Sequence, residues 1–458
     1  MVILVFLLLV SILLYLGSPM EPSKAYMSYS FTVCLLAVVY YYRSYKTAKN
    51  DVLKKIKIFG LVSVFVFAFF VVFFQRDIDY ILGICDPDEQ RFYDLVWAGA
   101  PHVICKSLCL SSVALISFLI GAYSIRTRYS LTTLYAANYK FKQPKYVCYI
   151  GYFLILIYLG LSGFNANPDE DDNRGILVLT QAVIIAAISI YCYKYKNEVN
   201  NIQQLWQYLR APIILCAIYL VVILATGKRG GAVKVGFILI FLYIYMIKVR
   251  IPYLRIMIFG FLGMLAMSLI GLLRFGSTMS VNDAIDYLYT FQSILPMTGE
   301  LAGSVNTLHV AIDNVPIKVP YNYGTSFFPG FSVLIPGFSR LLALTPFNFP
   351  NSEDIITRLY FGGAVPDWGW GLGSSAVADA YISFGLIGVI FVFWFLGRFF
   401  RKLEIKVLSM QHSPYALALA ICCYSQIFPL CRGPFSILFL SLSYSVIIIY
   451  LFTINTKS

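Results

Sequence analysis

The chain alternates between apolar runs and short polar segments along almost its whole length. A helix needs roughly 17 to 25 mainly apolar residues to cross ~30 Å of hydrocarbon. On this criterion the sequence predicts twelve membrane spans, at about residues 2–17, 26–42, 58–75, 103–124, 147–164, 176–193, 211–226, 232–247, 256–273, 384–397, 414–428 and 436–454. We therefore expect an all-α, polytopic transmembrane bundle of about 12 helices.

One segment between the predicted spans is much longer than the others. About 109 residues, 275–383, separate the ninth span from the tenth, and a connection of that length is usually functional or a small domain of its own. The sequence thus divides into helices one to nine in 1–273, a large helical loop in 274–383, and helices ten to twelve in 384–458.

The basic residues predict the orientation of the bundle. If both termini are cytoplasmic, the inner segments hold 22 Lys and Arg residues and the longer outer segments hold 11. Basic residues are retained on the cytoplasmic side. We expect cytoplasmic termini, with the large loop on the outer, periplasmic face.

Composition supports a membrane protein and argues against a nucleic-acid-binding one. Of the residues, 59% are hydrophobic and 12% are charged, whereas a soluble domain carries about 25% charged residues. The net charge of +13 comes from residues in short loops, not from a clustered basic face. The ten cysteines show neither a disulfide framework nor zinc spacing, so we expect no metal and no cofactor.

A set of cations lies at one predicted depth, at the outer boundary of the membrane. Guanidinium groups bind phosphate oxygens bidentately, and the glycines beside them allow a bulky anion to approach. The alternative is that these residues are anchors that reach to anionic head groups. The set consists of Lys228 and Arg229 in TGKRGG, Arg274 and Arg432, with Lys234 one turn further along.

The large loop is also rich in aromatic residues that could bind sugars. Aromatic faces pack against sugar rings, while Tyr and Trp donors reach hydroxyl groups. The best candidates are Tyr323, Trp368 and Trp370, the last two in the glycine-rich PDWGWGLG. Loop helices that rest on the membrane would explain the other aromatics equally well.

Transfer of a sugar to a hydroxyl needs a group that takes its proton near neutral pH. His309 has the most suitable unperturbed pKa, and Asp379 lies where the loop re-enters the membrane. These two residues are the predicted catalytic groups. The loop contains further candidate bases, most of them expected to be ordinary solvated charges: Glu300, Asp313, Glu353, Asp354 and Asp367.

Two segments carry a resemblance to a known family. VPYNYGTSFFPGFSVLIPGFSR, which ends at Arg340, and WGLGSSAVADAYISFGLIGVIFVFWFLG, which contains Asp379, resemble the signature of oligosaccharide repeat-unit polymerases of the Wzy type. The resemblance covers roughly 220–400 by motif. One position differs, because a glutamate is expected where the chain has Asp379.

The resemblance implies a metal-independent, inverting glycosyltransferase of the GT-C-like membrane class in the bacterial inner membrane. Its donor and acceptor would both be oligosaccharides linked to undecaprenyl diphosphate, and the cations, with Arg340, would hold the diphosphate. Membrane lipids and a Wzz-type chain-length co-polymerase are the other expected partners, and nucleic acid is not.

Two other functions remain open. An O-antigen ligase shares the topology and the lipid carrier, and commonly has a catalytic histidine in its large loop, as His309 would provide. A lipid-linked oligosaccharide flippase is the transporter alternative, but it should show related halves and no loop of this length.

Overall fold

The computed structural model describes residues 1–46, 60–84, 101–125, 139–162, 174–226, 229–247, 293–295, 298–329, 349–363, 371–408, 413–439 and 441–454. Within these ranges the protein is all-α apart from two paired dipeptides. In the described part of the chain, seven helices are long and apolar enough to cross a membrane, and the bent pair α4 (Leu61–Phe73) and α5 (Gln75–Ile81) adds an eighth if it forms one span. The predicted polytopic helical fold is confirmed, whereas the ninth predicted span, 256–273, lies outside the described residues.

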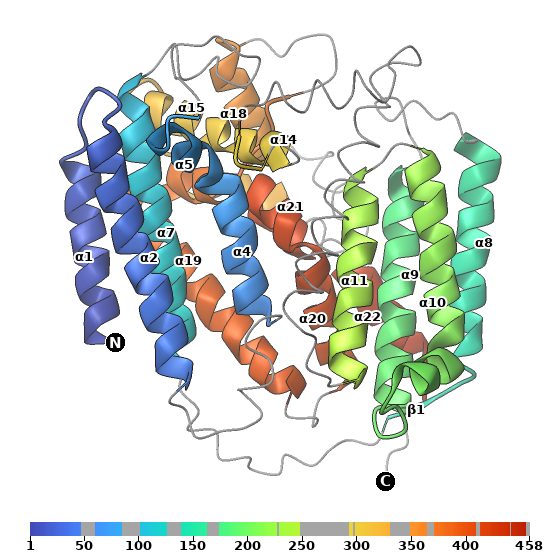
Figure 1. The fold of residues 1–458 in the computed structure, drawn as a ribbon. Helices are drawn as coiled ribbons and strands as arrows, with labels where there is room; N and C mark the ends of the chain where they lie inside the picture. Colours follow the sequence, from blue (N-terminus) through green and yellow to red (C-terminus); the bar gives the residue numbers. More distant parts are fainter. Residues whose placement is uncertain are drawn as a thin grey trace.

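The first group of helices packs around α7 (Ile104–Ser124). Every residue of α7 from Ile104 to Tyr123 is buried except Lys106. Figure 1 shows α7 surrounded by other helices of the group. These are α1 (Val2–Leu16), α2 (Lys24–Lys46), α4 and α19 (Ala376–Leu408).

Two glycines allow α7 and α19 to come into backbone contact. A Cβ atom at Gly121 would lie 1.9 Å from the carbonyl oxygen of Trp394, and one at Gly397 would lie 1.9 Å from that of Phe118. Small residues at a helix interface let the backbones approach closely in membranes. The crossing of α7 and α19 therefore requires glycine on both helices.

The second group lies beside the first and contains α8, α9, α10 and α11 with two C-terminal helices (Figure 1). A two-residue antiparallel ladder joins β1 (Lys140–Phe141) to β2 (Thr453–Ile454), with Lys140 opposite Ile454. The helices are α8 (Lys145–Ser162), α9 (Arg174–Lys194), α10 (Ile202–Ala225), α11 (Arg229–Ile247), α20 (Pro414–Ser425) and α22 (Leu442–Phe452).

Polar caps determine where several of these helices begin. The side chain of Asn201 accepts a hydrogen bond from the Gln204 N–H at the start of α10. Ser413 accepts one from the Ala416 N–H at the start of α20, where Pro414 occupies the first helical position. A side-chain cap satisfies an amide that has no partner within the helix, and proline at that position has no amide to lose.

Short helices cover one end of the bundle, opposite the labelled chain termini (Figure 1). They are α14 (Gly299–Ala302), η3 (Gly303–Val305), α15 (Asn306–Asn314), η4 (Thr325–Phe327) and α18 (Ser352–Tyr360). All of them belong to the predicted large loop. The described part of this loop is thus helical and packs on the bundle.

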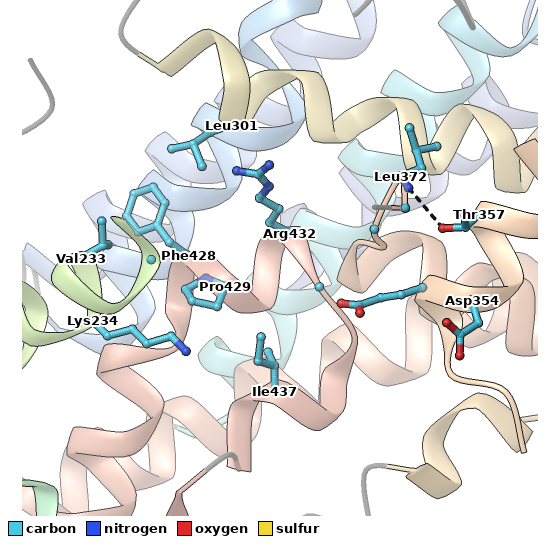
Figure 2. Close-up of a pocket in the computed structure, with 15 residues that line it drawn as sticks. Val233, Lys234, Leu301, Asp354, Thr357, Leu372, Phe428, Pro429, Arg432 and Ile437 are labelled. Carbon is cyan, nitrogen blue, oxygen red and sulfur yellow. Dashed lines mark hydrogen bonds between the residues drawn. The ribbon is translucent and has the colours of Figure 1, made fainter. Parts of the chain in front are cut away.

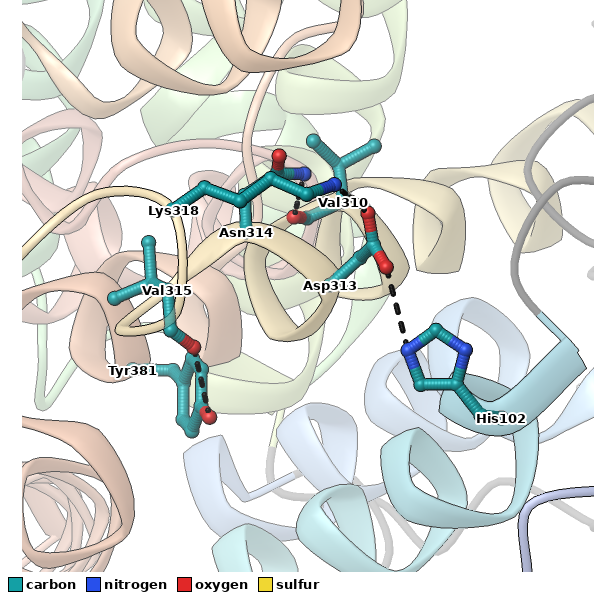
Figure 3. Close-up of polar contacts among 7 residues, drawn as sticks. All are labelled: His102, Val310, Asp313, Asn314, Val315, Lys318 and Tyr381. Carbon is teal, nitrogen blue, oxygen red and sulfur yellow. Dashed lines mark hydrogen bonds and ion pairs between the residues drawn. The ribbon is translucent and has the colours of Figure 1, made fainter.

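The end of α15 ties two of the long helices together (Figure 3). Asp313 contacts His102, in η1 (Pro101–Val103) just before α7, at 3.3 Å and Lys318 at 2.7 Å. Two residues further along, the carbonyl of Val315 accepts a hydrogen bond of 3.2 Å from the Tyr381 hydroxyl of α19. These contacts fix α15 between the start of α7 and the start of α19.

Helix α19 is broken near its beginning. Phe384 and Gly385 have non-helical backbone angles, and Gly385 has φ of 63°. The tenth predicted span, 384–397, therefore begins at the break, and the turns from Ala376 to Ser383 form a separate, buried first half of the helix.

Candidate active site

A cavity of about 620 Å³ lies where the two groups of helices and the short helices meet. Its walls come from α11, α14, α18, the segment 371–373, α21 (Ile427–Arg432) and the residues that follow α21. Figure 2 shows these side chains. The lining residues are Gly230, Val233, Lys234, Leu301, Glu353, Asp354, Thr357, Gly371, Leu372, Gly373, Phe428, Pro429, Arg432, Gly433 and Ile437.

Two cations line the cavity from different helices. Lys234 extends from the second turn of α11, and Arg432 extends from the end of α21 (Figure 2). Arg432 was predicted as a phosphate ligand, and Lys234 as a further member of the same set. An ammonium and a guanidinium from two helices that line one cavity can bind an anion with two negative groups.

Carboxylates face the same space from α18. The side chain of Asn351 caps this helix by accepting a hydrogen bond from the Asp354 N–H, and Glu353 and Asp354 occupy the first turn. Burial, followed by the nearby charges of Asp354 and Asp379, raises the pKa of Glu353 above its usual value. Asp354 is exposed. Glu353 is therefore the better candidate to accept a proton near neutral pH.

The glycine-rich segment after the predicted tryptophans is fixed to α18. The N–H of Leu372 donates to the Thr357 hydroxyl at 3.2 Å, and a Cβ at Gly371 would lie 2.5 Å from that oxygen. Gly373 has φ of +82°, which disfavours other residues. The segment forms a close-packed wall of the cavity.

The remaining wall is apolar. Val233, Leu301, Phe428, Pro429 and Ile437 line it. The Phe428 ring packs against that of Phe237 on α11, with 5.3 Å between ring centroids. The cavity thus combines cations, carboxylates and an apolar surface, a combination that fits a molecule with an anionic head and an apolar tail.

Asp379 does not line this cavity. Its side chain is fully buried in the first half of α19, and both carboxylate oxygens have donors. Oδ1 accepts from the Ser326 hydroxyl at 2.8 Å, and Oδ2 accepts from the Phe435 N–H at 3.1 Å. The structure therefore places the predicted base behind the turn that carries Arg432.

His309 is also away from the cavity. It is fully buried in α15, and its Nε2 lies 2.8 Å from the Ser107 hydroxyl of α7. Burial, followed by the charge of Arg76, lowers its pKa to about 3. The imidazole is thus neutral at physiological pH and belongs to the packing between α15 and α7.

A comparison with protein families agrees with these features. The family model described as O-antigen polysaccharide polymerase Wzy matches residues 207–458, which is more than half of the chain. The chain belongs to the Wzy family of O-antigen polysaccharide polymerases. No curated protein and no solved structure matches it significantly.

Membership of the Wzy family implies a polymerising membrane enzyme that acts on lipid-linked O-antigen substrates. Every residue that lines the cavity lies within the matched region. Among the described residues, no group of three or more His, Cys, Asp or Glu side chains could hold a metal ion.

The other predicted site residues of this Wzy family member fall into two groups. Tyr323 is described and is 72% exposed, but it does not line the cavity. Arg229 begins α11, and its side chain is not described. Outside the described residues lie Lys228, Arg274, Arg340, Trp368 and Trp370.

Three polar lining residues were not selected as site residues from the sequence. Glu353 and Asp354 were two loop carboxylates among several, and Thr357 was not considered. The pattern NSED (351–354) is a usable signal, because an Asn cap followed by acidic residues predicts a helix start that presents carboxylates.

Proposed function

We propose that the chain transfers the growing polysaccharide from undecaprenyl diphosphate to a new undecaprenyl-diphosphate-linked repeat unit at the periplasmic face of the bacterial inner membrane. The reaction inverts the anomeric carbon and uses no metal. A hydroxyl oxygen of the new unit bonds to the anomeric carbon of the donor, and the bond from that carbon to the diphosphate oxygen breaks. Undecaprenyl diphosphate leaves, and the hydroxyl proton passes to a base of the enzyme.

The observation that carries this proposal is the combination of groups around one cavity. Lys234 and Arg432 stabilise the negative charge that grows on the leaving diphosphate, an electrostatic role that often dominates catalysis. The apolar wall around Phe428 accepts the first isoprenoid units. The carboxylate of Glu353 faces the same cavity and serves as the base.

The raised pKa of Glu353 suits this role. A base is most effective when its pKa is close to the working pH. The reaction needs the ionised carboxylate, so activity should fall as the pH drops through the pKa of Glu353. Because that pKa lies above 4.5, the acid limb of the pH profile should also lie above 4.5.

Replacing Glu353 tests the proposal. Glu353→Gln should lower the rate of repeat-unit extension by roughly 10² to 10⁴ and remove the acid limb, while Glu353→Asp keeps part of the rate. Arg358→Gln is a matched control, because Arg358 is exposed on the same helix and does not line the cavity. Extension of a lipid-linked repeat unit by purified protein gives the rates.

The same variants can be tested in a deletion strain by running lipopolysaccharide on a gel. Loss of polymerisation leaves caps of one repeat unit, whereas loss of a ligase or a flippase leaves bare core. Wild-type chain lengths with Glu353→Gln would reject Glu353 as the base. Bare core in the deletion strain would reject the polymerase itself, and the position of His309 away from the cavity gives the ligase alternative no support.

A further inference from the structure

The turn at residues 432–435, which begins with Arg432, is hydrogen-bonded to Asp379. Arg432 ends α21, Gly433 is extended, and Pro434 has no N–H, so the first backbone donor after Gly433 is the N–H of Phe435. That N–H donates to Oδ2 of Asp379 at 3.1 Å. A hydrogen bond to a carboxylate is stronger than one between neutral groups. The bond therefore sets the position of the turn relative to α19.

The turn also packs closely against the proposed base. A Cβ at Gly433 would lie 3.1 Å from the carbonyl oxygen of Pro429 and 3.6 Å from Oε1 of Glu353. The backbone that follows Arg432 is thus beside the Glu353 carboxylate. A displacement of the turn would move the cation and the base relative to each other.

On its other side Asp379 binds the segment 321–326, which we call the strap. The Ser326 hydroxyl donates to Oδ1 of Asp379 at 2.8 Å and lies 3.3 Å from the Ser383 hydroxyl. The strap thereby fixes the rotamer of the carboxylate. Asp379 bridges two segments that lie far from each other in the sequence.

The strap is itself bound to the break in α19. The N–H groups of Asn322 and Tyr323 donate to the carbonyls of Ile382 and Ser383 at 3.0 and 3.1 Å. Both carbonyls lie at the end of the first half of α19. Carbonyls at a helix end have no partner within the helix and need donors from elsewhere. The break leaves room for Tyr321, because a Cβ at Gly385 would lie 2.7 Å from its hydroxyl oxygen.

We propose that Asp379 is a positioning residue that holds Arg432 at the cavity by linking the strap to the turn. The inference rests on the proposed function only in that Arg432 contacts the diphosphate. Asp379 acts here as an acceptor for two donors of the chain. It takes no proton from the substrate.

Asparagine separates this role from that of a base. In Asp379→Asn the amide oxygen still accepts from the Phe435 N–H, and the amide nitrogen can donate to the Ser326 oxygen. We expect this variant to remain active and to keep an acid limb, which should move toward lower pH because one of the charges that raise the pKa of Glu353 is removed. Asp379→Ala loses the acceptor and should raise KM for the lipid-linked donor at least about tenfold, since a hydrogen bond to a charged group is lost. Ser326→Ala leaves the bond to Phe435 and should have a smaller effect.

A double-mutant cycle tests whether Asp379 acts through Arg432. Arg432→Ala combined with Asp379→Ala should be no worse than Arg432→Ala alone, because coupled residues are not additive. If the effects of the two alanine substitutions were fully additive, the inference would be overturned. The same holds if a folded Asp379→Asn protein lost its activity and its acid limb.

A second readout does not depend on activity. A nitroxide attached to Arg432→Cys should be ordered when Asp379 is retained or replaced as Asp379→Asn, and mobile with Asp379→Ala. The nine described cysteines are all buried, and protein that retains Arg432 gives the background labelling. Equal mobility in all three would overturn the positioning role. Increased mobility together with full activity of Arg432→Ala would instead support positioning and reject the phosphate role of Arg432.

Discussion

Replacing His309 by glutamine tests whether this buried imidazole is structural or catalytic. His309 is fully buried on α15, with Nε2 at 2.8 Å from the Ser107 hydroxyl of α7. Glutamine keeps a hydrogen-bonding group of similar reach but cannot titrate near neutral pH. Because His309 does not line the cavity, we expect His309→Gln to polymerise at close to the wild-type rate at neutral pH.

The effect of His309 on stability depends on pH in a calculable way. Burial and Arg76 lower its pKa in the folded state from 6.5 to about 3. As the pH falls below 6.5 the unfolded chain takes up a proton that the folded protein does not. The contribution of neutral His309 to the free energy of unfolding is fully present above pH 6.5 and is lost as the pH falls toward 3. The loss is about 1.4 kcal/mol at about pH 5.5 and about 2 kcal/mol at about pH 5.

Thermal unfolding of purified protein in detergent, followed by intrinsic fluorescence between about pH 7.5 and about pH 5, measures this difference. The wild-type midpoint should fall more steeply with acidification than that of His309→Gln. Equal slopes would show that His309 is not the group responsible. Loss of polymerisation at neutral pH with an unchanged unfolding midpoint would refute the structural role and support a ligase-like one.

Two further predictions concern the helix crossing and the orientation. Gly397→Ala should destabilise the protein by at least about 2 kcal/mol because added volume at a close contact cannot be absorbed. Gly160→Ala is the control and should not destabilise it, since no atom lies within 4 Å of the new Cβ. Unfolding midpoints of the two variants measure the difference. For topology, Tyr323→Cys should react with an impermeant thiol reagent in intact cells, and Asn200→Cys, also exposed, only after permeabilisation. The reverse pattern would overturn the predicted orientation.

Hydropathy predicted the long helices well because lipid requires each one to satisfy its own backbone. The predicted run 103–124 corresponds to α7, and 147–164 corresponds to α8. Hydropathy could not show that α19 begins at Ala376, eight residues before the predicted span. The first half of α19 contains Asp379, Tyr381 and Ser383, which lower its mean hydropathy below that of the predicted span, although tertiary contacts bury it completely.

The sequence predicted which kinds of residue form the candidate site, but not which of them lie close together. Charge and depth indicated Arg432 and Lys234, because both follow directly from the position of a residue relative to a span. Glu353 could not be separated from the other loop carboxylates, since its raised pKa depends on burial against segments distant in the sequence. For His309 the unperturbed pKa was misleading as a guide, because complete burial stabilises the neutral form.

The structure shows contacts within the motif that carries the family resemblance which the sequence alone does not reveal. Tyr323 was predicted to bind sugar, yet its N–H closes the end of a broken helix and its side chain lies outside the cavity. Asp379 was predicted to accept a proton, yet both of its oxygens accept hydrogen bonds from the chain. One carboxylate thus accepts from a side-chain hydroxyl and from a backbone N–H, so a side chain that cannot form hydrogen bonds would release both segments. These contacts connect the motif to the position of the turn after α21, whereas a substrate in the cavity would meet the lining residues instead.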